Sequence, residues 1–231
     1  MPNLSTQTIV KLMQVYNLSE RPSLLTHFIS EIRDREIQRD PLRFRANIER
    51  IGHIMAYELS KQLHYQTRSV ETPLGTAPTA VLDEQLVVAT ILRAGLPLHH
   101  GFLDFFDRAE NAFISAYRKV KDDEDFDIHV EYVAAPDLTG KELLLVDPML
   151  ATGGSMHLSW QALLKSCGTP RHTHMVAIVA SQQAIDFLHS QFDDKAPVTL
   201  WVGVIDPALN EHAYIVPGLG DAGDLAFGSK L

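Results

Sequence analysis

Buried-strand patterns and helical patterns alternate along this chain. Apolar runs at 86–92, 143–146, 173–180 and 198–205 have the length and composition of strands buried on both faces of a parallel sheet. Residues 41–63 carry apolar side chains at three- and four-residue steps, which predicts a helix with one buried stripe. Strands that alternate with helices predict an α/β fold, with a central, mostly parallel sheet flanked by helices on both faces.

The other segments give shorter patterns. Residues 1–20 predict an N-terminal strand or arm, and 23–40 read as a helix that ends before Pro41, where a proline is tolerated as the next helix begins. Residues 67–84 contain two prolines and one glycine and predict a hairpin or loop. Further strands are expected at 112–117 and 128–134, and further helices at 96–106, 154–166 and 181–192.

The chain shows no linker and no internal repeat. Its 231 residues are enough for one α/β domain with a sizeable core. We therefore expect residues 1–231 to form a single domain, with 1–33 as an N-terminal arm and helix and 206–231 as a Gly-rich C-terminal segment.

The stretch 142–157, ELLLVDPMLATGGSMH, carries the clearest candidate chemistry. Its strand is expected to end at Asp147-Pro148, because proline cannot donate to a sheet, and small residues then lead into a helix. Two glycines bring bare backbone close to an anion, and the free N–H groups of a helix start point at it. No Walker A spacing is present, so the loop suits a monophosphate. Asp147 is placed to accept hydrogen bonds from ribose hydroxyls. The structural alternative is a tight turn with Asp147 as a cap.

Three stretches together carry a resemblance. VDPMLATGGS resembles the phosphoribosyl-pyrophosphate (PRPP) motif of type I phosphoribosyltransferases, in the Asp-Pro version of the uracil phosphoribosyltransferase family. ILRAGLPL at 91–98 and LNEHAYIVPGLGDAGDLAFG at 209–228 follow the family's order, and the resemblance runs from about residue 34 to the C-terminus. It implies the type I phosphoribosyltransferase fold, with a β-hairpin arm and a small base-binding hood at 206–231.

The resemblance also implies an activity, the transfer of the phosphoribosyl group from PRPP to uracil, which gives UMP and pyrophosphate. The implied catalytic residues are Arg93, Arg118 and Asp147, with both arginines at the pyrophosphate and Asp147 at the ribose. The implied PRPP-binding residues are these three together with Pro148, Met149, Leu150, Ala151, Thr152, Gly153, Gly154, Ser155 and Asp221. The alternative for Arg93 is a surface ion pair. The family often has a non-proline cis peptide in the Arg93 loop, which a sequence cannot confirm.

Uracil is expected against the Gly-rich stretch 214–227, in which we predict no regular element. Its backbone N–H and C=O groups can read the planar edge of the base, and the resemblance implies Ile215, Gly220, Asp221 and Ala222 for this role. The alternatives are a surface Ω-loop and, for Asp221 and Asp224, helix caps. Mg²⁺ is the implied cofactor, held through pyrophosphate and ribose oxygens and not by a protein carboxylate cage.

Composition narrows the classes further. Twenty basic and twenty-nine acidic residues give a net charge of −9, which argues against a dedicated nucleic-acid binder. The single cysteine cannot form an intramolecular disulfide, and neither a secretion signal nor an apolar run of membrane-spanning length is present. We expect a cytoplasmic location and no membrane partner. The family implies a homodimer or larger homo-oligomer, and GTP is a candidate effector that the sequence does not decide.

Two rival functions use the same fold. One is an RNA-binding regulator of pyrimidine genes, against which the net charge speaks. The other is a PRPP or nucleotide sensor without catalytic activity. The presence of the implied site residues argues against this function; they are Arg93, Asp147, Thr152, Gly153 and Asp221.

Overall fold

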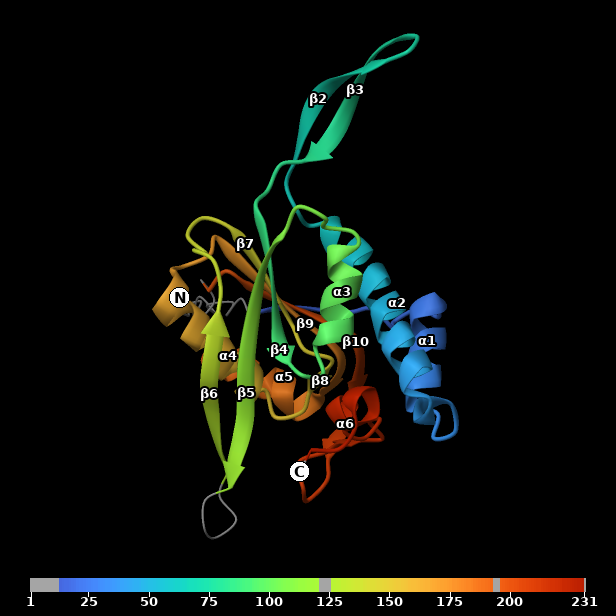
Figure 1. The fold of residues 1–231 in the computed structure, drawn as a ribbon, viewed down its shortest axis with the longest axis vertical. Coiled ribbons are helices and arrows are strands. Elements are labelled where there is room, and N and C mark those ends of the chain that lie inside the picture. The colour runs from blue at the N-terminus through green and yellow to red at the C-terminus, as the bar shows by residue number, and fades with distance from the viewer. Residues whose placement is uncertain (1–12, 121–125, 193–195, 231) are drawn as a thin grey trace, which may run out of the picture.

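An eight-stranded sheet forms the centre of the molecule (Figure 1). The structure, a computed structural model, describes residues 13–120, 126–192 and 196–230, and the side chains of 116–120 and 126–130 lie outside this description. The strand order is β1-β10-β9-β7-β4-β5-β6, with β8 beside β9, and only β5 and β6 pair antiparallel. The strands are β1 (Gln14–Asn17), β4 (Leu86–Leu92), β5 (Glu110–Val120), β6 (Phe126–Ala134), β7 (Glu142–Val146), β8 (Met149–Leu150), β9 (His172–Ser181) and β10 (Val198–Asp206). The predicted mostly parallel sheet is confirmed.

Helices cover both faces of this sheet, as predicted (Figure 1). One face packs against α1 (Leu24–Arg33), α2 (Pro41–Ser60) and α3 (Leu96–Leu103), and the other against α4 (Gly154–Cys167) and α5 (Gln182–Gln191). A hydrophobic core lies on each face of the sheet. Alternate residues of each strand pack into one core or the other, because successive side chains point to opposite faces. Leu144 of β7 therefore lies in the first core and Leu143 in the second.

The start of α2 follows from local chemistry. Asp40 accepts hydrogen bonds from the N–H groups of Leu42 and Arg43, and Pro41 occupies the first position of the helix. A short 3-10 turn (Ile37–Arg39) precedes this cap, and α1 ends earlier, at Arg33. The predicted helical stretch 23–40 is thus one helix and one turn.

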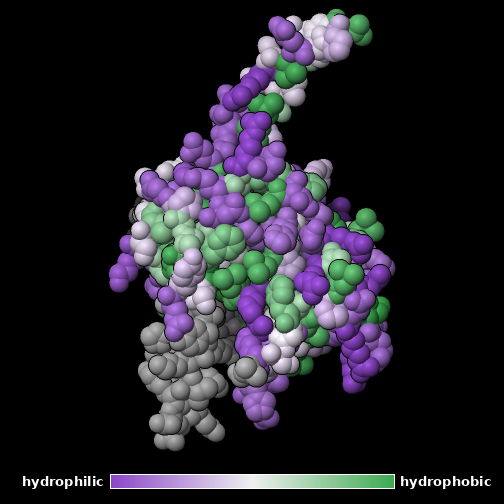
Figure 2. Space-filling view, in the orientation of Figure 1, coloured by the Kyte–Doolittle hydropathy of each residue, from purple (hydrophilic) through white to green (hydrophobic). Residues whose placement is uncertain are grey.

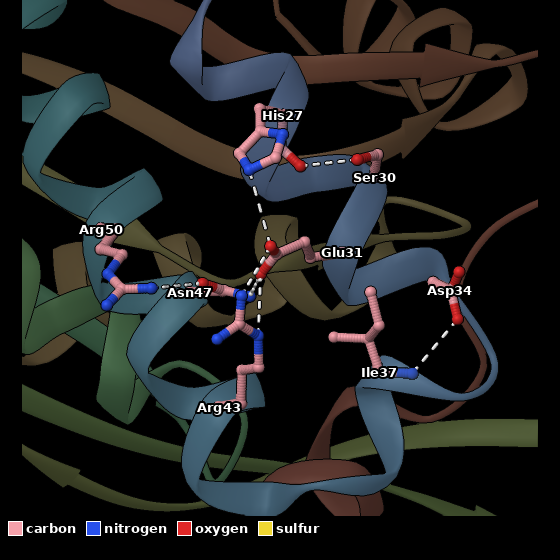
Figure 3. A network of polar contacts seen from close by, with 8 residues as sticks. All are labelled: His27, Ser30, Glu31, Asp34, Ile37, Arg43, Asn47 and Arg50. Carbon is pink, nitrogen blue, oxygen red and sulfur yellow. Dashed lines mark hydrogen bonds and ion pairs between the residues drawn. The ribbon is translucent and has the colours of Figure 1, made fainter.

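A buried carboxylate joins α1 to α2 (Figure 3). Glu31 accepts from Nη2 of Arg43 at 2.7 Å, from Nε of Arg43 at 3.1 Å and from Nδ2 of Asn47 at 2.6 Å. The hydrogen bond from Arg43 is the main reason that the pKa of Glu31 lies below its usual value. This network fixes the helix that carries Arg33.

The helices α2 and α3 cross at two glycines. A Cβ atom added at Gly101 would lie 2.3 Å from the carbonyl oxygen of Glu49, and one added at Gly52 would lie 2.9 Å from that of Leu98. Backbone therefore touches backbone at this crossing, which sets the height of α3 above the sheet. The helix ends at Leu103, three residues before the predicted end; Asp104 is its C-cap, and Phe106 still donates to the carbonyl oxygen of Phe102 at 2.9 Å.

A hairpin of β2 (Tyr65–Thr72) and β3 (Gly75–Leu82) projects from the body (Figure 1). Its residues are mostly exposed, and Figure 2 shows the arm standing out from the rest of the surface. Leu74 at the turn is 99% exposed. We predicted a hairpin or a loop here, and the structure has the hairpin. Residues 121–125, between β5 and β6, lie outside the described residues.

The C-terminal segment, which we call the hood (residues 206–231), corrects one prediction. It contains β11 (Ala208–Leu209), β12 (Ile215–Val216) and a helix, α6 (Ala222–Phe227), although we predicted no regular element at 214–227. The helix forms because Asp221 caps its N-terminus by accepting from the N–H of Asp224 at 3.0 Å. Within the described ranges, no helix is long and apolar enough to cross a membrane.

Candidate active site

Two loops meet at the carboxyl ends of neighbouring strands. β4 and β7 pair in parallel, with Thr90 opposite Val146, so Arg93 after β4 and Asp147 after β7 emerge side by side. The chain then runs to α3 on one face and to α4 on the other. Such a switch point opens a crevice in which α/β proteins bind their ligands.

Gly95 lets the first loop fold tightly against these strand ends. A Cβ atom at this position would lie 2.2 Å from Oγ1 of Thr90 and 3.1 Å from the carbonyl oxygen of Val146. Only glycine fits there without moving the strands. The peptide bond between Leu92 and Arg93 is cis, a point that the sequence had left open.

The second loop, 147–155, is anchored on β9 before it reaches α4. The carbonyl oxygen of Pro148 accepts from the N–H groups of Ile178 and Val179, at 3.1 and 3.0 Å. β7 ends at Val146 as predicted, but Met149 and Leu150 form the short strand β8, which corrects our prediction of a loop through 149–155.

The end of this loop forms the expected cradle. Gly153 precedes α4 with a φ of 82°, and no side chain caps the helix. Apart from that of Gly154, the N–H groups of the first turn are therefore free to bind an anion. Thr152 accepts weakly from the N–H of Gly154 at 3.5 Å, and Ser155 lies in the first turn. A small hollow of about 40 Å³ lies here, lined by residues 149–153, 155 and 156.

Asp147 lies half-buried at the base of this cradle. Burial raises its pKa to about 7, the negative charge of Asp221 contributes in the same direction, and the N–H of Met149 at 3.4 Å opposes the shift. The carboxyl group therefore exchanges its proton near neutral pH. The hood lies close to the 147–155 loop, because β12 contacts β9, on which that loop is anchored.

Ser181 fixes the middle of the loop, a role that our sequence reasoning missed. Its Oγ donates to the carbonyl oxygen of Ala151 at 2.5 Å and accepts from the N–H of Ala184 at 2.9 Å. A serine directly before a helix is a recognisable N-cap signal. The contact with Ala151 has no such local signal.

Arg93 reaches from the first loop to the hood. Its Nη2 atom lies 3.1 Å from Oδ1 of Asp224 and donates at 3.1 Å to the carbonyl oxygen of Gly228. Arg93 and Asp224 are each 37% exposed. Arg93 is therefore in an ion pair, as our alternative had it, but its partner belongs to the expected base-binding segment.

Two more arginines, from α1 and α2, form hydrogen bonds with the hood. Arg33 of α1 pairs with Asp206, which accepts in turn from the N–H of Gly218 at 2.9 Å. Arg45 of α2 donates to the carbonyl oxygen of Ala226 at 2.7 Å. Neither arginine was singled out from the sequence, because its partner lies more than 170 positions away along the chain.

The expected uracil residues lie together in the hood. Ile215 and Ala222 are buried, Asp221 is half-buried, and Gly220 is exposed with a φ of 96°. Asp221 is the helix cap that we named as an alternative. Arg118 lies in β5, opposite Ile128, and its side chain lies outside the described part of the structure.

Other features lie away from these loops. A hollow of about 760 Å³ opens at the base of the β2–β3 hairpin, lined among others by Arg68, Leu82, Phe105 and Arg108. In the part of the chain that the structure describes, Glu49, His53 and Asp104 form the one group of three side chains with metal-ligand spacing, between α2 and α3.

The parallel sheet, the phosphate-type cradle and the arginine loop beneath a separate hood define the phosphoribosyltransferase class. The model of the uracil phosphoribosyltransferase family matches residues 19–229. The uracil phosphoribosyltransferase of Porphyromonas gingivalis is 57% identical over 219 residues, which cover 95% of this chain and 100% of that protein. That of Pyrococcus furiosus is 33% identical over 94% of this chain and 91% of its own. This chain belongs to the uracil phosphoribosyltransferase family.

A solved structure agrees with this assignment at the level of the fold. The AQ2163 protein of Aquifex aeolicus superposes with a TM-score of 0.82 at 29% sequence identity, over 94% of this chain and 100% of that one.

Proposed function

We propose that this chain transfers the phosphoribosyl group of PRPP to uracil, giving UMP and pyrophosphate. Membership of the family supports this reaction. The observation that carries it is the meeting of the Arg93 loop and the 147–155 loop at the ends of β4 and β7, with Arg93 bound to the hood. Donor and acceptor sites for the transfer would then adjoin each other.

The proposed PRPP site divides into three parts. The cradle at Thr152–Ser155 holds the 5′-phosphate through backbone N–H groups and hydroxyls. Asp147 accepts hydrogen bonds from the ribose, and Arg93 and Arg118 neutralise the departing pyrophosphate. Pro148–Ala151 shape the floor, because they are anchored on β9 and Ser181.

The proposed uracil site uses the backbone of Ile215, Gly220, Asp221 and Ala222. An edge of alternating N–H and C=O groups complements uracil, whereas cytosine reverses the hydrogen-bonding sense at its amino group. Each buried group left unpaired would cost about 1–3 kcal/mol. This difference is the proposed source of base specificity.

The proposed phosphoribosyl transfer depends on positioning of the substrates and on charge stabilisation, and it needs no covalent intermediate. Positive charge develops on the ribose ring as pyrophosphate leaves, so the arginines and the carboxylate of Asp147 flank the reacting bond. Mg²⁺ suits this site, since it retains several waters and would be held mainly through pyrophosphate and ribose oxygens, with Asp221 as the proposed contact to PRPP or to the hydrated ion. When bound, the ion would neutralise charge on the pyrophosphate.

We also propose one domain over 1–231, a homodimer or larger homo-oligomer, and a cytoplasmic location. The exposed β2–β3 hairpin supports assembly, because an isolated two-stranded hairpin is marginally stable in water and Leu74 at its turn is uncovered. GTP is proposed as an effector, which turnover with and without GTP would test.

The first experiment is turnover with uracil, PRPP and Mg²⁺, with UMP and pyrophosphate quantified and with cytosine, orotate and hypoxanthine run in parallel. Of the four bases, we expect only uracil to give product, and we expect Asp147→Ala to form no product. PRPP binding without product from any base would reject the enzyme and favour the sensor. A salt-dependent shift of RNA would favour the regulator.

A further inference from the structure

The helix α6 cannot hold its own position. It has six residues, and isolated helices shorter than about 12–15 residues are marginal in water. Its place in the hood therefore depends on contacts with the rest of the chain. Arg45 holds the carbonyl oxygen of Ala226, and Arg93 holds Asp224 and the carbonyl oxygen of Gly228.

Arg93 has donors left after making these contacts. Among the described residues, only its Nη2 atom is hydrogen-bonded, and Nε is buried without a partner. A guanidinium has five N–H donors, so the two on Nη1 remain for an anion, besides the buried one on Nε. Arg93 can thus bind pyrophosphate oxygens while Nη2 still holds the hood.

The contact with Asp224 lies within one turn of the proposed uracil residues. Asp221 caps the N–H of Asp224 at 3.0 Å, and Ala222 begins the helix. A Cβ atom added at Gly223 would lie 3.2 Å from Oδ1 of Asp221 and 3.9 Å from Nη2 of Arg93. The position of the guanidinium therefore bears directly on the position of the uracil-binding backbone.

We propose that Asp224 is a positioning residue that couples the pyrophosphate site to the uracil site through Arg93. An anion on the free donors of Arg93 orders the guanidinium, which orders α6 and raises the affinity for uracil. By linkage, uracil raises the affinity for the anion by the same factor. This inference rests on the proposed function, because it takes Arg93 as the pyrophosphate ligand.

The test measures uracil binding with and without magnesium pyrophosphate. This pair cannot react, because no ribosyl group is present. In the wild type we expect pyrophosphate to increase uracil affinity at least about fivefold. The ratio of uracil affinities with and without pyrophosphate should fall in Asp224→Asn to within about twofold of one. Asp224→Glu keeps the carboxylate and should restore part of this ratio.

Arg45→Met is the matched control, because it loosens the same helix without touching Arg93. It should weaken uracil binding equally with and without pyrophosphate, and so preserve the ratio. The proposal is overturned if the wild type shows no ratio above one, if Asp224→Asn keeps the wild-type ratio, or if Arg45→Met abolishes it as well.

A measurement on the wild type alone covers the case in which Asp224→Asn does not fold. Amide hydrogen exchange of residues 222–228 should slow on addition of magnesium pyrophosphate, and unchanged exchange would overturn the coupling. Turnover of the wild type distinguishes a failure of this inference from a failure of the proposed function. UMP formation without coupling rejects this inference only, whereas no UMP from any condition rejects the proposed function.

Discussion

Nη2 of Arg33 lies 2.8 Å from both carboxylate oxygens of Asp206, and the same carboxylate accepts from the N–H of Gly218. The side chain of Asp206 is 5% exposed and that of Arg33 is 22% exposed. One buried carboxylate therefore ties the first helix, the end of β10 and the hood together. This pair supports the proposed uracil site without contacting the base.

Asp206→Asn should destabilise the fold and weaken uracil binding. It leaves the largely buried Arg33 without a counter-charge, which typically costs about 3–5 kcal/mol in a buried pair and about 2–4 here, because Arg33 is partly exposed. Urea unfolding measures the stability, and KM for uracil should rise more than KM for PRPP. The exposed pair Arg39–Glu36 provides the control, since Arg39→Ala should cost under about 1 kcal/mol. Equal losses in the two variants would contradict this account.

Gly153→Ala should damage the cradle, and Gly140→Ala provides a matched comparison. Both glycines have positive φ, 82° and 75°, so an alanine at either costs about 1–2 kcal/mol. At Gly140 nothing lies within 4 Å of the new Cβ, whereas at Gly153 Cδ1 of Phe187 lies 2.7 Å away. We expect about 1–3 kcal/mol of further destabilisation at Gly153. KM for PRPP should rise only in Gly153→Ala, and a similar rise in both would count against the cradle.

The pKa of Asp147 near 7 predicts a pH profile for PRPP. The proposed ribose contact uses the carboxylate, which in the free protein forms as pH rises through about 7. The value of kcat/KM for PRPP should therefore increase between about pH 6 and 8 in the wild type. Asp147→Asn should be less active and flat over this range. A wild-type profile without a step near pH 7 would reject this assignment.

The same shift predicts how stability depends on pH. The pKa of Asp147 lies above its ordinary value in the folded state, so the native state keeps a proton that the unfolded chain has lost. The free energy of unfolding contributed by this group therefore falls as pH rises from about 4 to about 7, and is constant above that. Comparison of urea unfolding of the wild type with Asp147→Asn across this range isolates the effect. A difference between the two proteins that does not change with pH would exclude it.

Arg171 binds two carboxylates at the amino-terminal ends of β4 and β7, away from the candidate site. It donates to Glu84 at 2.7 Å and to Glu142 at 2.8 Å, and both acidic side chains are at least nine-tenths buried. Burial, followed by the charge of Glu142, already raises the pKa of Glu84. Glu84, whose pKa is raised, gains its charge at higher pH than Glu142, whose pKa is lowered, so Arg171→Met should cost more stability at pH 8 than at pH 5.

Urea unfolding at the two pH values measures this difference. Arg68→Met serves as the control, because Arg68 pairs with the exposed Asp83 at 3.5 Å. Its effect should be small and should not depend on pH. A loss in Arg171→Met that is equal at both pH values would show that packing, and not charge, explains the role of Arg171.

Local patterns in the sequence predicted most elements and the chemistry of the central loop. The apolar runs of β4, β7, β9 and β10 predicted buried strands, because burial on both faces requires continuous apolar residues. The Asp147–Ser155 loop was predicted as a phosphate cradle, since glycines and hydroxyls before a helix act through neighbouring backbone. Each of these signals lies within a few residues of the feature that it predicts.

Tertiary structure alone decided which distant residues meet. Arg93 and Asp224 lie 131 positions apart, and Arg33 and Asp206 lie 173 apart, so no periodicity or motif links them. The helix α6 was missed for the same reason, because Gly223 weakens the local helix preference and contacts from Arg45 and Arg93 compensate. The sequence by itself thus determined the fold class and the cradle, whose physics is local. The hood was decided by long-range contacts, which exist only once the sheet has brought its strand ends together.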